Sequence, residues 1–218
     1  VTINSGGNMQ RIIDHKAIDV LIERKQNKNI YIRAVDAHTI KVTCNRRVLE
    51  KDIERLIETN EKAIQKMLDI KRKEEEKKAY FWYLGKPYIP VLDEISKIPY
   101  FDGTHIYAKD EKALQKFYQK ECFRVFQSEL ERILPSFKNI PFFTLKIRAM
   151  KTRWGVNNRG SNTITLNSEL LKKDLDLLDY VIIHELCHFY EANHSDRFWR
   201  HVSEFYPYYK EARRRLRE

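Results

Sequence analysis

The chain has 218 residues and a mass of 26.3 kDa, and 42% of its residues are hydrophobic, which is enough for the core of one or two globular domains. With only six glycines, six prolines and three cysteines, collagen-like, low-complexity and disulfide-scaffold proteins are excluded. The net charge of +10 favours anionic partners without naming one. We expect a cytoplasmic protein without a membrane segment, because no apolar run approaches the roughly 20 residues of a membrane span and the opening VTINSGGNMQR lacks the apolar stretch of a signal peptide. The three widely spaced cysteines suggest neither a disulfide framework nor a cysteine zinc site.

The N-terminal part is predicted to be rich in β-structure. Residues 1–9, rich in Gly, Ser and Asn, are expected to be disordered or an addition from expression, and residues 10–108 to form strands plus one long helix. Apolar and polar residues alternate from about Ala17 to Cys44, which predicts strands. From Glu50 to about Lys78 the apolar residues recur at helical spacing, and the polar KRKEEEKK tail indicates a solvated helix end.

Two short β-type stretches follow, with turns expected at Gly85–Lys86 and Asp102–Gly103. A second domain is expected over residues 109–218. It opens with a helix predicted from Glu111 to Leu134, which Pro135 ends. The next expected elements are a strand over Phe142–Met150, a turn over Asn157–Gly160 and helices to the end of the chain.

The segment 177–199 contains the residues that carry chemistry. At about 100° per residue, His184 and His188 lie one turn apart on one face of a helix, and apolar residues fill the opposite face. Within 180–190, Glu185 is the only charged residue. An unpaired carboxylate in such an apolar helix costs several kcal/mol of desolvation. A bound dication would offset that cost.

A glutamate directly after the first of two histidines four positions apart forms HExxH, a motif in which the imidazoles bind one Zn²⁺. Glu185 is then the expected general base of a metallopeptidase. His194, six residues beyond His188, is the expected third ligand if the helix ends near residues 191–193, with Asn193 as a left-handed terminator. Three protein ligands leave one position open, as in catalytic zinc sites.

Alternative interpretations remain open for these residues. The two HExxH histidines could be ordinary core residues, His194 a capping or surface imidazole, and Cys187 a fourth ligand that makes the zinc structural. Metzincins share the ligand spacing but match poorly, because Glu191 replaces their glycine and no Met follows Met150.

Four motifs together resemble the YgjP-like metallopeptidases, which are related to the WLM and SprT-type zinc proteases. They are RWG (153–155), TITLN (163–167), DYVIIHELCH (179–188) and NHSDRFW (193–199). The resemblance covers most of the chain. The chain departs from the family's usual pattern at Val156 and Asn157, where the family commonly shows Ser-Cys.

This resemblance implies an α+β protein with a zincin-like minimal metalloprotease core, made of helices plus a small antiparallel sheet and preceded by the β-rich region. It also implies one zinc per chain. The ligands carried over by the motifs are His184, His188 and His194, with Glu185 as the base. The substrate would be a peptide or protein.

Further roles are predicted on physical grounds. The alternating stretch Asn162–Asn167 is a candidate edge strand for pairing with the substrate backbone, or else an ordinary internal strand. Arg153, Tyr190 and Tyr206 are available to stabilise an oxyanion, and the sequence does not choose among them. Phe198 and Trp199 are expected to pack under His194.

Basic residues cluster before the HExxH helix and at the C-terminal end. Such clusters could contact phosphates, so a nucleic-acid-associated module with structural zinc or lapsed peptidase activity is the alternative function. A solvated basic face is the simpler interpretation, because no DNA-binding motif accompanies the charge. The residues concerned are Lys146, Arg148, Lys151, Arg153, Arg159, Arg213, Arg214, Arg215 and Arg217.

Overall fold

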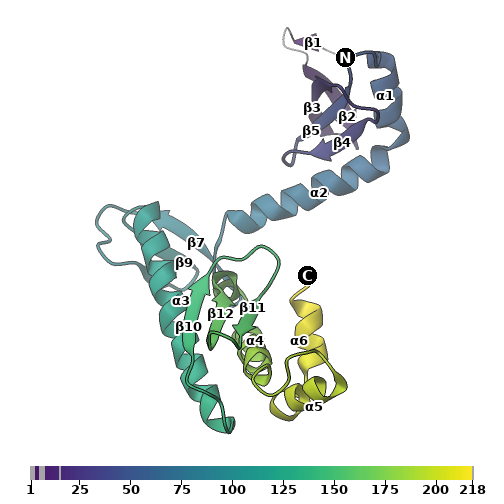
Figure 1. The fold of residues 1–218 in the computed structure, drawn as a ribbon. Coiled ribbons are helices and arrows are strands. Elements are labelled where there is room, and N and C mark those ends of the chain that lie inside the picture. The colour runs from purple at the N-terminus through teal and green to yellow at the C-terminus, as the bar shows by residue number, and fades with distance from the viewer. Residues whose placement is uncertain (1–2, 5–7, 15, 218) are drawn as a thin grey trace. The chain divides into compact units, whose positions relative to one another are not determined.

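A computed structural model describes residues 3–4, 8–14 and 16–217, which form two compact units within residues 1–79 and 80–218 (Figure 1). The domain boundary expected after residue 108 falls inside the second unit. Within the N-terminal residues 1–9, positions 3–4 and 8–9 belong to strands, and the others lie outside the described residues. None of the helices in the described ranges combines the length and apolar character that crossing a bilayer requires.

A five-stranded sheet forms the centre of the first unit. Its order is β1-β2-β3-β5-β4; β3 and β5 run parallel, and the other neighbours are antiparallel. Ile40, Val42 and Cys44 are fully buried on β5, as the alternation predicted. The strands are β1 (Ile3–Asn4), β2 (Asn8–Ile13), β3 (Lys16–Lys25), β4 (Tyr31–Ala34) and β5 (Thr39–Asn45).

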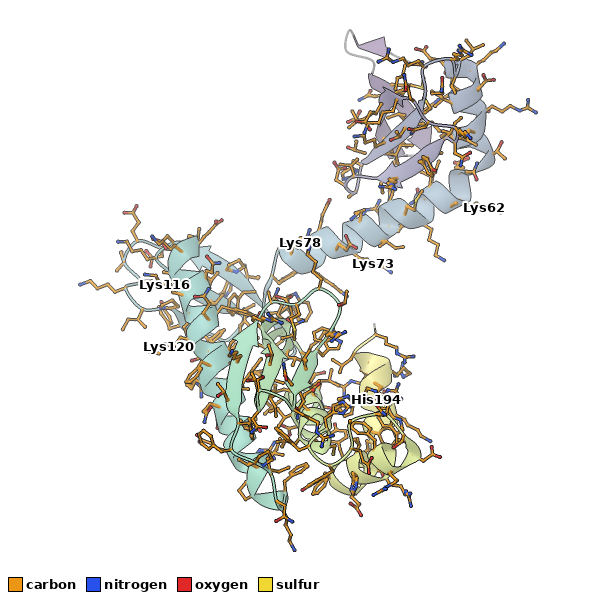
Figure 2. All side chains as sticks on the ribbon, in the orientation of Figure 1. Lys62, Lys73, Lys78, Lys116, Lys120 and His194 are labelled. Carbon is orange, nitrogen blue, oxygen red and sulfur yellow. The ribbon has the colours of Figure 1, made fainter. Side chains whose placement is uncertain are left out.

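The helix predicted over 50–78 is two helices, α1 (Glu50–Thr59) and α2 (Glu61–Lys78). They meet at Asn60, where the side-chain Nδ2 donates to the Leu56 carbonyl at 2.8 Å. Such a local side-chain bond competes with the helical backbone and explains the break. The buried isoleucines and leucine of both helices pack on the sheet, while lysines such as Lys62, Lys73 and Lys78 extend from exposed positions of α2 (Figure 2).

The second unit begins with a four-stranded sheet of order β6-β7-β9-β8. Both predicted turns are present, and Gly85 and Gly103 have positive φ values of 79° and 52°, which glycine adopts without steric cost. Helix α3 (Glu111–Ile133) starts where Asp110 Oδ1 accepts a bond from the Ala113 N–H. It ends at a short 3₁₀ turn that contains Pro135. The strands are β6 (Phe81–Tyr83), β7 (Lys86–Leu92), β8 (Tyr100–Asp102) and β9 (His105–Ala108).

A three-stranded sheet follows, with β10 (Thr144–Arg148), β11 (Gly155–Asn158) and β12 (Thr163–Asn167) in the order β10-β12-β11. The predicted α+β class is confirmed, but the sheet is mixed, because β10 runs parallel to β12. Of the two alternatives considered for Asn162–Asn167, the internal strand is confirmed and the edge strand is wrong. Four of the five residues of β12 are buried, so this strand takes the centre, and β11 lies at the edge.

The remaining helices complete the second core. Phe126 of α3, Leu166 of β12, Leu178 of α4 and Phe198 of α5 are fully buried in one cluster. This shared core fixes the sheet against the helix that carries HExxH. The elements concerned are the 3₁₀ segment Ser168–Lys172 and the helices α4 (Leu175–Cys187), α5 (Asp196–Phe205) and α6 (Tyr209–Arg215).

Candidate metal centre

Helix α4 carries the HExxH residues from the core into a cleft. Nine of its 13 residues are buried, including Glu185, which is 4% exposed. The helix begins after Asp174. The Asp174 carboxylate makes no cap bond and pairs instead with Arg215. Arg215 also pairs with Asp176, so these ion pairs attach the C-terminal helix to the start of α4.

The end of α4 differs from the prediction. The helix stops at Cys187, with His188 as its C-cap, rather than near residues 191–193. Asn193 is not among the described residues with positive φ, so it is not a left-handed terminator. The chain turns earlier because the N–H groups of 189–191 bond to the carbonyls of residues 186 and 187. Ser195 then caps α5 by accepting from the Phe198 N–H.

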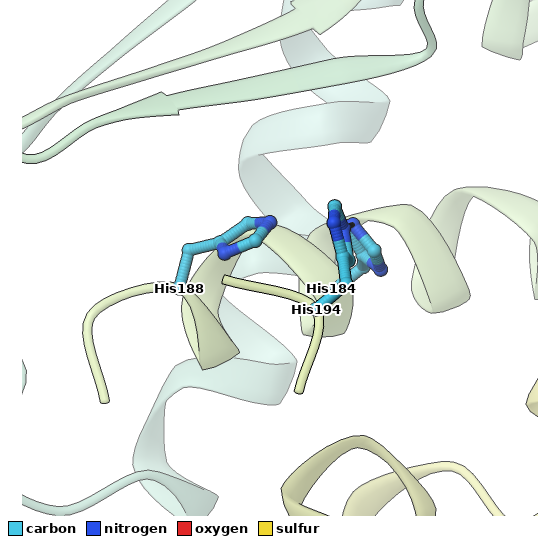
Figure 3. A group of neighbouring side chains, drawn as sticks. All are labelled: His184, His188 and His194. Carbon is cyan, nitrogen blue, oxygen red and sulfur yellow. Dashed lines mark hydrogen bonds between the residues drawn. The ribbon is translucent and has the colours of Figure 1, made fainter. Parts of the chain in front are cut away.

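This turn brings His194 back to the two histidines of α4 (Figure 3). One ring nitrogen from each of His184, His188 and His194 lies within 4.8 Å of the others. The Nε2 atoms of His184 and His194 are 3.0 Å apart. The three imidazoles expected from the sequence are therefore together, and no Cys, Asp or Glu of the described chain joins this group.

Neighbouring groups orient two of the rings. The Tyr180 hydroxyl lies 3.4 Å from Nδ1 of His184, and the Glu191 carbonyl oxygen lies 3.1 Å from Nδ1 of His188. A partner at Nδ1 fixes the ring and leaves Nε2 as the donor atom for a metal. Tyr180 was not singled out from the sequence, although its position one helical turn before His184 is a readable signal.

Aromatic side chains support the histidines from α5. Phe198 is fully buried, and its ring centroid lies within 4.9 Å of the centroids of all three imidazoles. Trp199 stacks on His194 at 5.5 Å. This is the packing predicted from the sequence, and it holds the loop that carries His194.

All three histidines are kept neutral. Burial, followed by the neighbouring imidazoles and Arg213, lowers the pKa of His184 to about 3. Burial also lowers the pKa of His188 and of His194. Neutral imidazoles are the form that binds metal, so no proton has to leave at neutral pH.

The donor set fits a tetrahedral metal ion. With Zn–N distances of about 2.0–2.1 Å, ligand nitrogens in a tetrahedral zinc site lie about 3.3 Å apart. The nitrogens of His184 and His194, at 3.0 Å, are close to that spacing. Three neutral nitrogens also leave one coordination position for solvent or substrate.

The side chain of Glu185, which belongs to α4, lies against the edge strand β11. Burial raises the pKa of its carboxyl to about 8, against smaller lowering effects from the Asn157 backbone and the charge of Arg153. A Cβ atom at Gly155 would lie 2.7 Å from Cγ of Glu185, so only glycine leaves room there. The Asn157 side chain donates to the Glu185 carbonyl at 2.7 Å. The RWG motif thus has a steric reason, and Asn157 ties strand to helix.

A cleft of about 610 Å³ opens beside Glu185 and the histidines. Its lining includes Arg153, Arg159, Arg213 and Arg217. The basic cluster predicted before the HExxH helix is therefore divided: two of its arginines reach the cleft, while Lys146 and Arg148 lie on β10 at the other edge of the sheet. The sequence showed the basic C-terminal end but gave no sign that it returns to this site.

The structure distinguishes the three residues considered for stabilising an oxyanion. Arg153 lines the cleft. The Tyr190 hydroxyl instead donates to the Lys138 carbonyl at 2.7 Å, and the Tyr206 hydroxyl lies 3.4 Å from the Asp176 carboxylate. Neither tyrosine lines the cleft.

Asn167, at the end of β12, holds the loop that presents Arg153. Its side chain is 3% exposed and donates to the carbonyls of Met150 and Arg153, both at 2.8 Å. Its Oδ1 accepts from the N–H groups of Met150 and Glu169. One buried amide thus satisfies four backbone groups, one of which belongs to the cleft-lining Arg153.

A search of the curated proteins gives no match. Solved structures that resemble the chain include two metallopeptidase zymogens. Jannalysin of Methanocaldococcus jannaschii is 24% identical with a TM-score of 0.38, over 42% of this chain and 92% of that one. Abylysin of Pyrococcus abyssi is 26% identical with a TM-score of 0.35, over 44% of this chain and 90% of that one.

The model of the YgjP-like metallopeptidase domain matches residues 28–218. The chain therefore belongs to the YgjP-like metallopeptidase family.

Proposed function

We propose that the protein is a zinc-dependent peptidase that hydrolyses peptide bonds with Glu185 as general base. The observation that carries the proposal is the gathering of three neutral imidazoles beside one buried carboxylate in an open cleft. His184, His188 and His194 would hold one zinc ion per chain. The family match supports the peptidase class.

Zinc, when bound, polarises a peptide carbonyl and lowers the pKa of water to about 7. In the zinc-bound protein, the nearby positive charge offsets the effect of burial on the pKa of Glu185 and favours its ionised form. The Glu185 carboxylate then accepts the proton of the attacking water and later delivers it to the leaving amine. Gly155 allows this carboxylate to lie against β11 without a clash. The apolar face of α4, buried in the core, keeps the histidines and the base in a fixed relation during the reaction.

Strand β11 would bind the substrate backbone. It is an edge strand, and Gly155, Val156 and Asn157 line the cleft. Unpaired backbone groups at a sheet edge accept an extended peptide as an added strand. We assign substrate pairing to β11 and not to Asn162–Asn167, because Asn162–Asn167 lies inside the sheet.

We place this activity in the cytoplasm. All three cysteines are free and buried, and such thiols are typical of proteins from a reducing compartment.

Metal content and turnover test the proposal together. The zinc-loaded protein should bind one zinc per chain and cleave an unfolded protein substrate. Glu185→Gln should keep the zinc and lose roughly 10²- to 10⁴-fold in turnover, the usual contribution of a general base. His188→Ala should lose both the zinc and the turnover. Equal turnover in wild type and Glu185→Gln would contradict the proposed mechanism.

A further inference from the structure

The cleft beside the histidines has a one-sided charge. Among the lining residues within 3–4, 8–14 and 16–217, four are arginines and Glu185 is the single carboxylate. Glu185 is buried and lies against β11. Of the four arginines, Arg153 is the one whose charge lowers the pKa of Glu185, so the other three have no acidic counterpart among the described lining residues. The arginines come from three separate places: Arg153 precedes β11, Arg159 follows it, and Arg213 and Arg217 lie in and just after α6.

These arginines are not committed to structural ion pairs. Within residues 3–4, 8–14 and 16–217, none of the four has a carboxylate oxygen within 4.0 Å. Two other arginines of α6 behave differently. Arg214 pairs with Glu211, and Arg215 pairs with Asp174 and Asp176. The helix therefore uses two of its three guanidinium groups for structure, and the third, Arg213, lines the cleft together with Arg217 just after the helix.

Arg213 is also held in place. Its guanidinium lies 4.4 Å from the centroid of the Trp199 ring, the same ring that stacks on His194. A cation over an indole face is stabilised by the ring quadrupole. The positive charge is thus fixed next to the metal centre before any substrate arrives, which reduces the entropy lost on binding.

We propose that the cleft selects peptides that carry a carboxylate close to the bond to be cleaved. This inference rests on the proposed peptidase function and names its substrate class. An acidic peptide would compensate the guanidinium groups, whereas a basic peptide would be repelled by them. Arg159 and Arg217, both exposed at the cleft wall, are the specificity-determining residues that a bound carboxylate can reach.

A peptide fits these observations better than a nucleic acid. The unpaired arginines face a concave cleft of about 610 Å³, within the range of small-molecule pockets, which is about 300–1,000 Å³. Duplex binding instead uses cations spread along a surface that follows the phosphate backbone.

Binding to zinc-loaded Glu185→Gln tests the inference without turnover. The probes are fluorescent, C-terminally amidated peptides in which every second residue is Glu, Gln or Lys. The Glu peptide should bind about tenfold more tightly than the Gln peptide at low salt, since each exposed ion pair contributes up to about fivefold. The Lys peptide should bind most weakly, and salt should reduce the differences.

Arginine variants locate the effect. Arg159→Gln and Arg217→Gln should each lower the preference for Glu over Gln by about two- to fivefold. Arg214→Gln removes the same charge from α6, close in sequence to Arg217 but outside the cleft lining, and should leave the preference unchanged. A free-acid Gln peptide separates two sources of the carboxylate: restored affinity assigns recognition to the peptide C-terminus, and unrestored affinity assigns it to a side chain.

Three results would overturn the inference: equal affinity for the Glu and Gln peptides, a preference that neither variant changes, or tighter binding of a single-stranded oligonucleotide that the same variants abolish. The two proposals fail separately. Wild type that cleaves peptides while Glu185→Gln shows no charge preference defeats only the substrate class. Selective binding of acidic peptides without any cleavage by wild type defeats only the peptidase.

Discussion

Two buried glutamates, one in α3 and one in α4, differ in how their charge is balanced. Glu121 is 8% exposed and accepts hydrogen bonds from Arg124 at 2.6 and 2.9 Å and from the Tyr83 hydroxyl at 2.6 Å. Glu185 is 4% exposed, and no cationic side chain of the described chain lies within ion-pair distance of it. Burial alone therefore does not distinguish them, but their partners do.

The difference appears in their acidities. Arg124 lowers the pKa of Glu121, whereas burial raises the pKa of Glu185 to about 8. A buried carboxylate that is paired adds little net stability but is costly to break. A buried carboxylate left without a cation is costly in itself, so it marks the place where a cation or a proton is needed. We therefore assign Glu121 to structure and Glu185 to chemistry.

Replacing each glutamate by glutamine gives the largest expected contrast. Glu185→Gln should lose roughly 10²- to 10⁴-fold in turnover and unfold at about the wild-type denaturant concentration. Glu121→Gln should keep its turnover and lose about 1–2 kcal/mol of unfolding free energy, because Arg124 and Tyr83 lose a charged acceptor. Turnover assays and urea unfolding of both variants check this. A large loss of turnover in Glu121→Gln would break the comparison.

The same two helices can also be compared through one buried and one exposed hydrophobic side chain. Leu178 of α4 is fully buried, and Phe123 of α3 is 60% exposed. Leu178→Ala should lower the free energy of unfolding by about 2–5 kcal/mol through a cavity. Phe123→Ala should change it by less than about 0.5 kcal/mol. If both substitutions cost the same in urea unfolding, the assigned core is wrong.

Gly155→Ala tests whether Glu185 depends on the space beside β11. The added methyl would meet Glu185, so we expect about a 10²-fold loss in kcat/KM from a displaced base, with zinc content retained. Gly160→Ala is the matched control, since its Cβ would make only an ordinary contact of 3.5 Å with Asn158. Unchanged kinetics in Gly155→Ala would show that the carboxylate tolerates displacement.

The smallest expected effect concerns acid stability. The pKa of Glu121 is lowered in the folded protein below its ordinary value of 4.5, so the unfolded state binds the proton more readily. Its contribution to stability is then present above about pH 4.5 and lost as the pH falls through the lowered value. The stability gap between wild type and Glu121→Gln should shrink below pH 4.5 in urea titrations. A gap that widens with acid would reverse the assigned sign.

Local features could be predicted from the sequence. The buried face of β5 follows from strict alternation, and the convergence of His184 and His188 follows from helical geometry. The single helix predicted over 50–78 was wrong because one side-chain hydrogen bond at Asn60 decides the break. Periodicity does not register such a bond.

Long-range features could not be predicted. Strand order depends on which strand the helices bury, so the sequence could not decide whether Asn162–Asn167 is an edge or an internal strand, and β11 is the edge strand beside it. The approach of Arg213 to the histidines depends on the Trp199 contact and on the ion pairs of Arg215, which join segments about 40 residues apart. Neither arrangement leaves a periodic signal.

The way Asn167 supports the cleft wall has a consequence for how this protein can change. The buried Asn167 amide positions the backbone from Met150 to Arg153. The conformation of that loop therefore does not depend on its outward-facing side chains. Mutations at those outward positions can therefore exchange charge or size while the candidate metal centre stays in place. New preferences for substrate can arise in this loop at little cost to the proposed hydrolysis.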